Sequence, residues 1–98
     1  MRASVALLIA EEITYDAIGQ PIKTEVPREI FCEIASVSMN EFMQAGQIGI
    51  NAQHKIVTPV MNYGGEKIVE LNGTRYGVYR TYCNSDIIEI YLERKGGL

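Results

Sequence analysis

The clearest alternation of hydrophobic and polar positions lies near the end of the chain, in residues 87–93. Ile88, Ile90 and Leu92 fall on one face of this run, and Glu89, Tyr91 and Glu93 fall on the other. An alternation with a period of two is typical of a half-buried β-strand. Two similar runs come before it, bounded by Gly64-Gly65, Asn72-Gly73 and Asn84-Ser85-Asp86. We therefore predict an antiparallel meander over residues 63–95.

Asn72-Gly73 is the strongest turn signal in this region. The two residues stand between two β-type runs. A type I′ turn needs a positive φ at both central positions, which asparagine and glycine tolerate best. The pair therefore predicts a two-residue β-hairpin.

The first third of the chain also reads as extended structure. In residues 4–15, one parity carries Val5, Leu7, Ile9, Ile13 and Tyr15. Residues 16–20 form a turn in which Gly19 can supply a positive φ. Residues 21–27 then return as an extended arm, an edge strand or a loop, because Pro27 cannot donate to a ladder. Residues 28–37 are the next strand, with apolar side chains on both faces, and its first face holds Ile30, Cys32 and Ile34.

After this strand the period changes to that of a helix. Ser38 is followed three residues later by Glu41, which is the pattern of a capping box. Met39, Phe42, Met43 and Gly46 follow at helical spacing, so we predict one short helix over residues 38–46. The next segment, GQIGINAQH, has no period and is predicted to be a mobile loop. Residues 54–62 resume as a strand, with an edge or bulge at Pro59.

These elements predict a single domain over residues 1–98. Of the 98 residues, 47% are hydrophobic and 21% are charged, which is ordinary for a globular protein. We expect a mainly β fold, a small antiparallel β-barrel rich in meanders, with one short α-helix in a long loop. Closure is expected because it removes exposed strand edges. The side chains predicted to be buried are Ile34, Val78, Ile88, Ile90 and Leu92.

Charge and cysteine content limit the classes of function. The net charge is −3, so an affinity built mainly on neutralising phosphates is not expected. The apolar run from Val5 to Ala10 is too short for a signal peptide or a membrane span, which predicts an intracellular, soluble protein with no membrane contact. Cys32 and Cys83 both lie in predicted strands, where we expect buried free thiols rather than a disulfide.

The residues that could carry catalysis or bind a metal do not form a known pattern. His54 is the single histidine and has no cysteine or carboxylate at ligand spacing. Cys32 could pair with His54 as a nucleophile and base, but a thiol in mid-strand on an apolar face would be inert. Glu11 and Glu12 are adjacent in a strand and so point to opposite faces. We expect no enzyme activity, no metal and no cofactor.

Arginines are interleaved with tyrosines in the C-terminal half, and the group includes Tyr76, Tyr79, Arg80 and Tyr82. They can be ordinary strand residues, since tyrosine favours strands. They can also form a surface for a protein partner, because both residue types are enriched at interfaces. A third interpretation is a nucleic-acid platform of aromatic and basic side chains. The neighbouring acidic residues oppose this third interpretation.

Four motifs together resemble one protein family. They are SMNEFMQA, YGGE, GTRYGVYRT and the ending DIIEIYLERKGG. In this order they are similar to the small head–tail adaptor proteins of tailed bacteriophages and prophages, also called head-closure or stopper proteins. The resemblance runs from about Glu12 to the C-terminus.

The resemblance implies a structural virion protein. Copies would form a ring below the portal that extends or closes the DNA channel, retains the packaged DNA and joins the tail. The implied partners are other copies of the chain, a portal or adaptor protein above, a tail protein below, and double-stranded DNA in transient contact. The implied location is the head–tail junction of the virion, and the host cytoplasm during assembly.

Two groups of residues are candidates for these contacts. The glycine-bearing segment after the predicted helix keeps isoleucines that it cannot bury, and together with the resemblance this predicts a channel or subunit contact at Gln44, Gln47, Ile48, Ile50, Asn51, Gln53 and His54. The predicted partner surface is Tyr76, Tyr79, Arg80 and Tyr82. The alternative function is a small barrel of the OB type that binds single-stranded nucleic acid.

Overall fold

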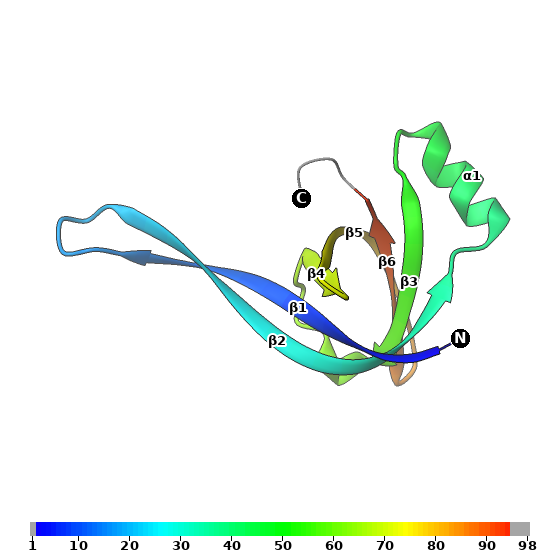
Figure 1. Ribbon diagram of the computed structural model, residues 1–98, viewed down its shortest axis with the longest axis horizontal. Coiled ribbons are helices and arrows are strands. Elements are labelled where there is room, and N and C mark those ends of the chain that lie inside the picture. Colours follow the sequence, from blue (N-terminus) through cyan, green and yellow to red (C-terminus); the bar gives the residue numbers. More distant parts are fainter. Residues whose placement is uncertain (1, 95–98) are drawn as a thin grey trace.

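The protein is a closed antiparallel barrel with a helix outside it (Figure 1). A computed structural model describes residues 2–94, so Lys95, Gly96 and Gly97 of the last motif lie outside the described residues. Around the barrel the strands follow the order β1-β2-β3-β6-β5-β4. The predicted fold class is thereby confirmed. The elements are β1 (Arg2–Tyr15), β2 (Pro21–Ser36), α1 (Met39–Gln47), β3 (Ala52–Pro59), the 3₁₀ turn η1 (Val60–Asn62), β4 (Ile68–Leu71), β5 (Thr74–Asn84) and β6 (Ile87–Glu93).

The hairpin of β1 and β2 is longer than the barrel that it helps to close. β4 pairs with β1 over Leu7–Ile9, and β3 pairs with β2 over Glu33–Ser36. Among the described residues, the strand residues 10–15 and 21–26 pair only with each other. This two-stranded segment, residues 10–26, is called the arm below, and it projects away from the barrel (Figure 1). The predicted edge strand at 21–27 is thus confirmed, but it continues into 28–36 as one strand.

The core lies inside the barrel. Ile88, Ile90 and Leu92 are buried there as predicted, whereas Ile34 and Val78 are only partly buried against the cluster. Near the start of β1 the core face carries Ala6 and Leu8, not the parity of Val5 and Leu7. Residues directly opposite in a sheet share a face, and the partners of the inward-facing Ile30 and Val69 are Ala6 and Leu8. Val5 is therefore turned outward.

The hairpin turns of the last three strands form as the sequence predicts. Asn72 and Gly73 have φ values of 50° and 81° between β4 and β5, as a type I′ turn requires. Ser85, with φ of 59°, opens the turn between β5 and β6. These turns set the register that places alternate β6 side chains in the core.

Helix α1 begins as predicted but ends later. The Ser38 hydroxyl accepts a hydrogen bond from the Glu41 backbone N–H at 3.1 Å, so Ser38 is the N-cap. Gly46 lies inside the helix, and the left-handed residue after it is Gly49, with φ of 82°. The long mobile loop predicted after the helix is also wrong, because only residues 48–51 separate α1 from β3.

The prediction of two buried thiols is half right. Cys32 is buried, and burial raises the pKa of its thiol. Cys83 is free as well but exposed. It lies near the end of β5, beyond the Thr74–Gly77 segment that pairs with β4, so this part of β5 has a strand neighbour on one side only.

Replacing Ile90 by alanine should remove a central part of the core. The Ile90 side chain is fully buried, so we expect Ile90→Ala to lower the free energy of unfolding by about 2–5 kcal/mol in chemical denaturation. The matched control is Ile18→Ala, at a residue 78% exposed on the arm. There the change should stay within about 0.5 kcal/mol. Equal effects of the two substitutions would contradict this core.

Candidate functional site

A carboxylate clamps helix α1 to the barrel. Glu41 Oε2 accepts a hydrogen bond from the Tyr79 hydroxyl of β5 at 3.0 Å, and Glu41 Oε1 accepts one from Arg80 Nη2. The Arg80 guanidinium also lies 4.1 Å from the centre of the Tyr91 ring on β6. Charge-assisted bonds of this kind are stronger than neutral ones. Glu41 therefore joins a helix with little buried surface of its own to two neighbouring strands.

The clamp brings the two predicted groups of site residues together. A cavity of about 350 Å³ opens beside the Glu41 carboxylate. From the predicted channel group it is lined by Gln44, Ile48 and Ile50, and from the predicted partner surface by Tyr79 and Arg80. The helix end and the tyrosine–arginine strand thus form one local surface.

The pKa values of Tyr79, which lines this cavity, and of Tyr91, which lies under Arg80, are both raised. Burial, followed by the hydrogen bond to Glu41, raises the pKa of Tyr79 far above its usual range. Burial, followed by the hydrogen bond to Glu89, raises the pKa of Tyr91 to about 12. The Tyr79 phenol donates to Glu41 in the clamp, and the Tyr91 phenol donates to Glu89 on its own strand.

The other predicted residues are scattered. Gln53 donates to Asn51 at 2.9 Å, and Gln47 ends the helix. His54 lies on β3, not in a loop, and its ring meets Tyr76 edge to face at 5.4 Å. Tyr76 belongs to the core, so its place in the predicted partner surface is wrong. Tyr82 is exposed.

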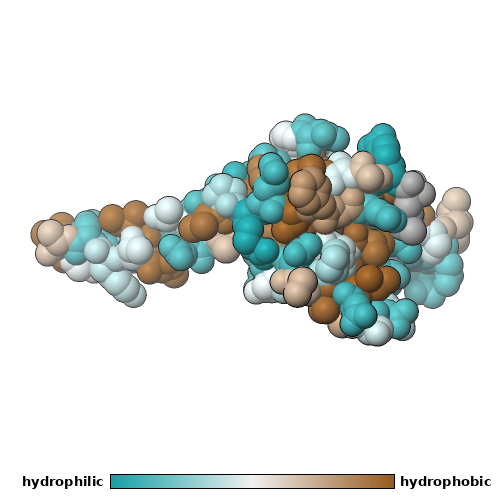
Figure 2. Space-filling model, turned by 90° about the horizontal axis from the view of Figure 1, so that it is seen from below, coloured by the Kyte–Doolittle hydropathy of each residue, from teal (hydrophilic) through white to brown (hydrophobic). Residues whose placement is uncertain are grey.

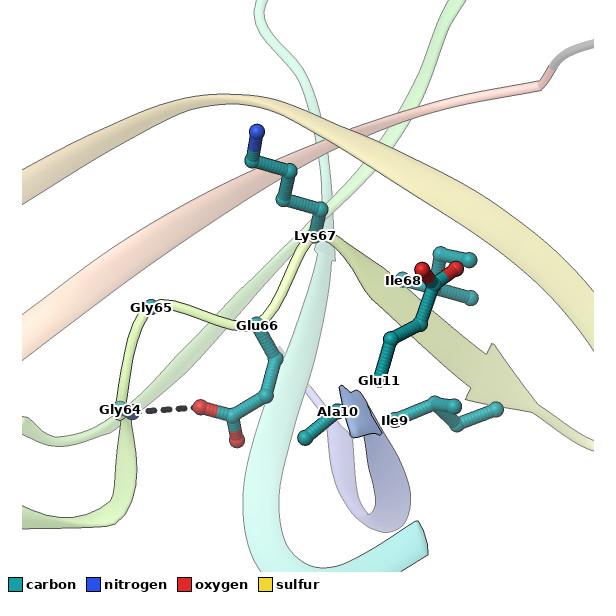
Figure 3. A pocket seen from close by; sticks show the side chains of 8 residues that line it. All are labelled: Ile9, Ala10, Glu11, Gly64, Gly65, Glu66, Lys67 and Ile68. Atoms are coloured by element: carbon teal, nitrogen blue, oxygen red, sulfur yellow. Dashed lines mark hydrogen bonds between the residues drawn. The ribbon is translucent and has the colours of Figure 1, made fainter. Parts of the chain in front are cut away.

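The YGGE motif forms a clasp at the base of the arm (Figure 3). Glu66 is buried, and its carboxylate accepts hydrogen bonds at 2.8 Å from the Gly64 backbone N–H and from Arg28 Nη2 on β2. The Tyr63 hydroxyl donates to the Glu66 carbonyl at 2.7 Å. A cavity of about 400 Å³ lies beside the clasp, between β1 and this loop. In the described residues this motif acts as a brace for the hairpin.

A second ion pair holds the arm to the opposite side of the barrel. Arg75 on β5 donates to both oxygens of Glu25 on the arm, at 2.7 and 2.8 Å. The hydrogen bonds from Arg75 are the first cause that lowers the pKa of Glu25. Two-pronged pairs of this type fix orientation as well as distance. The arm therefore leaves the barrel in a defined direction.

The sequence interpretation missed the roles of Glu66, Arg28, Glu25 and the Glu41 carboxylate. Each of these residues has its partner far away in the chain, so no local spacing shows the pair. The motif patterns YGGE and GTRYGVYRT were the available signal. They mark residues that brace the arm and the helix.

Two other kinds of site are absent from the part of the chain that the structure describes. Within residues 2–94 no group of three or more His, Cys, Asp or Glu side chains is placed to hold a metal ion. None of the helices in that range is both long and apolar enough to cross a membrane.

No family model matches the sequence, and no curated protein matches it either. The features of the chain that bear on function are a closed barrel, a clamped helix and a braced arm.

Adding a methyl group at Gly64 should disturb the clasp. A Cβ there would lie 2.8 Å from Glu66 Oε1, so the carboxylate must move and loses hydrogen bonds. We expect Gly64→Ala to destabilise the protein by about 1–3 kcal/mol in thermal or chemical denaturation. Gly46→Ala is the control, because it lies in the helix with open space around it and should stabilise by about 0.5–1 kcal/mol. Two substitutions of the same sign would contradict the clasp.

The clamp should be visible in an alkaline titration. The pKa of Tyr91 is raised from 10.0 to about 12. The protonated Tyr91 phenol therefore stabilises the fold fully below pH 10, and this contribution is lost as the pH rises towards 12. Glu41→Gln should move the tyrosinate absorbance curve to lower pH, because the Glu41 carboxylate raises the pKa of both Tyr79 and Tyr91. Glu12→Gln, which removes an exposed carboxylate on the arm, should leave the curve unchanged. An unmoved curve in the Glu41 variant would refute the clamp.

Proposed function

We propose that this protein is a structural component of a phage head–tail connector. Copies of the chain form a ring below the portal that extends or closes the DNA channel and joins the tail. The four sequence motifs suggest this role, and the shape of the chain supports it. A filled barrel serves as the body, while the arm and helix reach outward from it.

The observation that carries the proposal is the exposure of large apolar side chains on the elements outside the barrel. Monomeric soluble proteins rarely leave such side chains grouped in solvent, and groups of them mark contact surfaces. Figure 2 shows apolar side chains along the arm. On the arm the exposed residues are Ile13, Tyr15, Ile18, Ile22 and Val26, and on or next to α1 they are Met39, Phe42, Met43 and Ile48.

The charge of the chain suits a channel through which DNA must move. The net charge is −3, and Arg80, Arg75 and Arg28 are each paired with a carboxylate. A wall rich in free cations would bind phosphates and hold the DNA back. A wall of neutral and acidic residues lets it pass.

Within this proposal the end of α1 is the channel or subunit contact. Ile48 is exposed there, beside Gln44, Gln47 and Asn51. Deleting residues 48–52 would not test this idea, because Ala52 is buried and the Asn51 carbonyl accepts from Arg94 N–H. A single substitution at Ile48 leaves those barrel contacts in place.

The alternative function, binding of single-stranded nucleic acid, would use exposed tyrosines as stacking platforms. Tyr82 is available for stacking, but Tyr76 is in the core and Tyr79 is bonded to Glu41. The platform is thus smaller than the sequence suggested. A DNA titration at two salt concentrations separates the two functions, since binding through phosphates weakens steeply with salt.

We expect the purified protein to show no steeply salt-dependent DNA binding and to copurify with the portal and tail proteins encoded beside its own gene. Ile48→Ser should weaken that copurification about tenfold, which is about 1.4 kcal/mol, with an unchanged melting temperature. Asn40→Ser, on the exposed surface of the same helix, is the control and should have no effect. Tight, salt-sensitive DNA binding without copurification would instead establish the alternative.

A further inference from the structure

The arm presents apolar side chains in a position where its own barrel cannot cover them. Ile13 and Tyr15 share one face of the ribbon with their cross-strand partners Lys23 and Pro21. Ile18 stands in the turn at the tip. An isolated two-stranded ribbon is only marginally stable in water, so five exposed apolar side chains on one are costly without a partner. Contacts within the tip and at the base nevertheless brace the arm.

Those contacts hold the tip in one conformation. The Asp16 carboxylate accepts hydrogen bonds from the backbone N–H groups of Ile18 and Gln20, at 3.0 and 2.9 Å. Gly19 adopts the positive φ of 83° that the turn requires. Arg75 holds the base of the arm through Glu25. Because these contacts already hold the apolar tip of the arm in place, the tip loses little conformational entropy when it docks.

A mostly apolar groove lies at the other end of the same chain. It has a volume of about 490 Å³, and its lining includes Ala3, Phe31, Val57, Pro59, Ile87 and Glu33. A cavity of about 150 Å³ holds one benzene ring, so this groove has room for two or three side chains. The Thr58 hydroxyl at the groove donates to the Phe31 carbonyl at 2.9 Å and accepts from Asn62 at 3.0 Å, which keeps its shape.

The arm cannot reach this groove within one chain. Twelve strand residues (15 − 3) separate Ala3 at the groove from Tyr15 near the tip. At about 3.3 Å per residue, this is about 40 Å of extended strand. In Figure 1 the tip and the N-terminus lie at opposite ends of the molecule, whose longest extent is 51 Å. The tip of the arm and the groove can therefore meet only between two copies of the chain.

One cation of the arm can meet the anion of the groove, while the other charges of the arm are negative. Lys23 lies directly across from Ile13 on the arm and is the cation among arm residues whose other charges are Glu11, Glu12, Asp16 and Glu25. The Lys23 Nζ lies 3.4 Å from a Glu11 carboxylate oxygen, and both side chains are well exposed. This ion pair therefore contributes little to stability. The charged side chain on the groove is Glu33. Docking the arm would bring a cation to an anion.

We propose that the arm of one copy docks into the Phe31–Ile87 groove of the next, with Lys23 paired to Glu33. This contact is heterologous, so it produces a ring where the rotation between copies closes and a filament where it does not. Within the proposed function, this is the contact that builds the ring. Only the closure of the ring around a DNA channel rests on the proposed function.

The contact is expected to be weak for a single pair of copies. Two strands of six residues are about 20 Å long and about 5 Å apart, so one face of the arm buries only a few hundred Å². A stable interface buries about 800 Å² on each partner. The isolated protein should therefore be monomeric when dilute and associate when concentrated, and a closed ring gains from having two such contacts per copy.

Charge reversal tests the proposal with the purified chain alone. Sedimentation velocity over rising concentration should show association of the wild type, and Lys23→Glu or Glu33→Lys should each weaken it at least about tenfold. The double variant, or an equal mixture of the two single variants, should restore it. Lys67→Glu, an exposed reversal outside both surfaces, should have no effect. Unchanged melting temperatures exclude unfolding as the cause.

A cross-link identifies the surfaces directly. In a Cys83→Ser background, Ile18→Cys combined with Ile87→Cys should form disulfides between copies under mild oxidation, joining tip to groove. Three outcomes would each overturn the proposal: disulfides that join tip to tip, single charge reversals that have no effect on association, and a wild type that stays monomeric up to about 1 mM. If association follows the charge pattern but portal and tail proteins do not copurify, the proposed function fails and the arm contact stands. If the portal and tail proteins copurify but association does not follow the charge pattern, the arm contact fails and the proposed function stands.

Discussion

The short pairing between β1 and β4 is the constraint on which the rest of the structure depends. Only Leu7–Ile9 and Ile68–Glu70 form this seam, yet it turns a meander into a closed barrel. Closure decides which parity of β1 faces inward, and so it buries Leu8 opposite Val69. It also creates the arm. Because β1 and β2 continue past the seam, their outer halves leave the barrel together.

The polar contacts outside the core serve to aim the projecting parts. Glu66 with Arg28, and Glu25 with Arg75, brace the arm, while Glu41 with Tyr79 and Arg80 holds the helix. Each contact joins residues far apart in the chain. The well-exposed Glu25–Arg75 pair contributes little to stability, so its clearer effect is on direction. In a protein whose proposed role is assembly, the direction of an arm determines which neighbour it meets.

The exposed apolar residues distinguish this barrel from one that acts alone. The interior is filled, with Leu8, Ile56, Ile90 and Leu92 fully buried, so it has no central ligand chamber lined by these side chains. The apolar surface that remains is carried by the arm, the helix and the groove near Phe31. Exposed apolar side chains grouped in this way mark contact surfaces.

The sequence by itself determined the local elements. Alternation at Ile88, Ile90 and Leu92, the Asn72-Gly73 turn and the Ser38 cap all depend on neighbours within a few residues, and all three form as predicted. Only the tertiary structure decided the inward face of β1, the burial of Tyr76 and the exposure of Cys83. It also decided that Glu41 reaches across to β5. These features depend on which strands become neighbours. The period and spacing of residues within one strand do not indicate which other strand will pair with it.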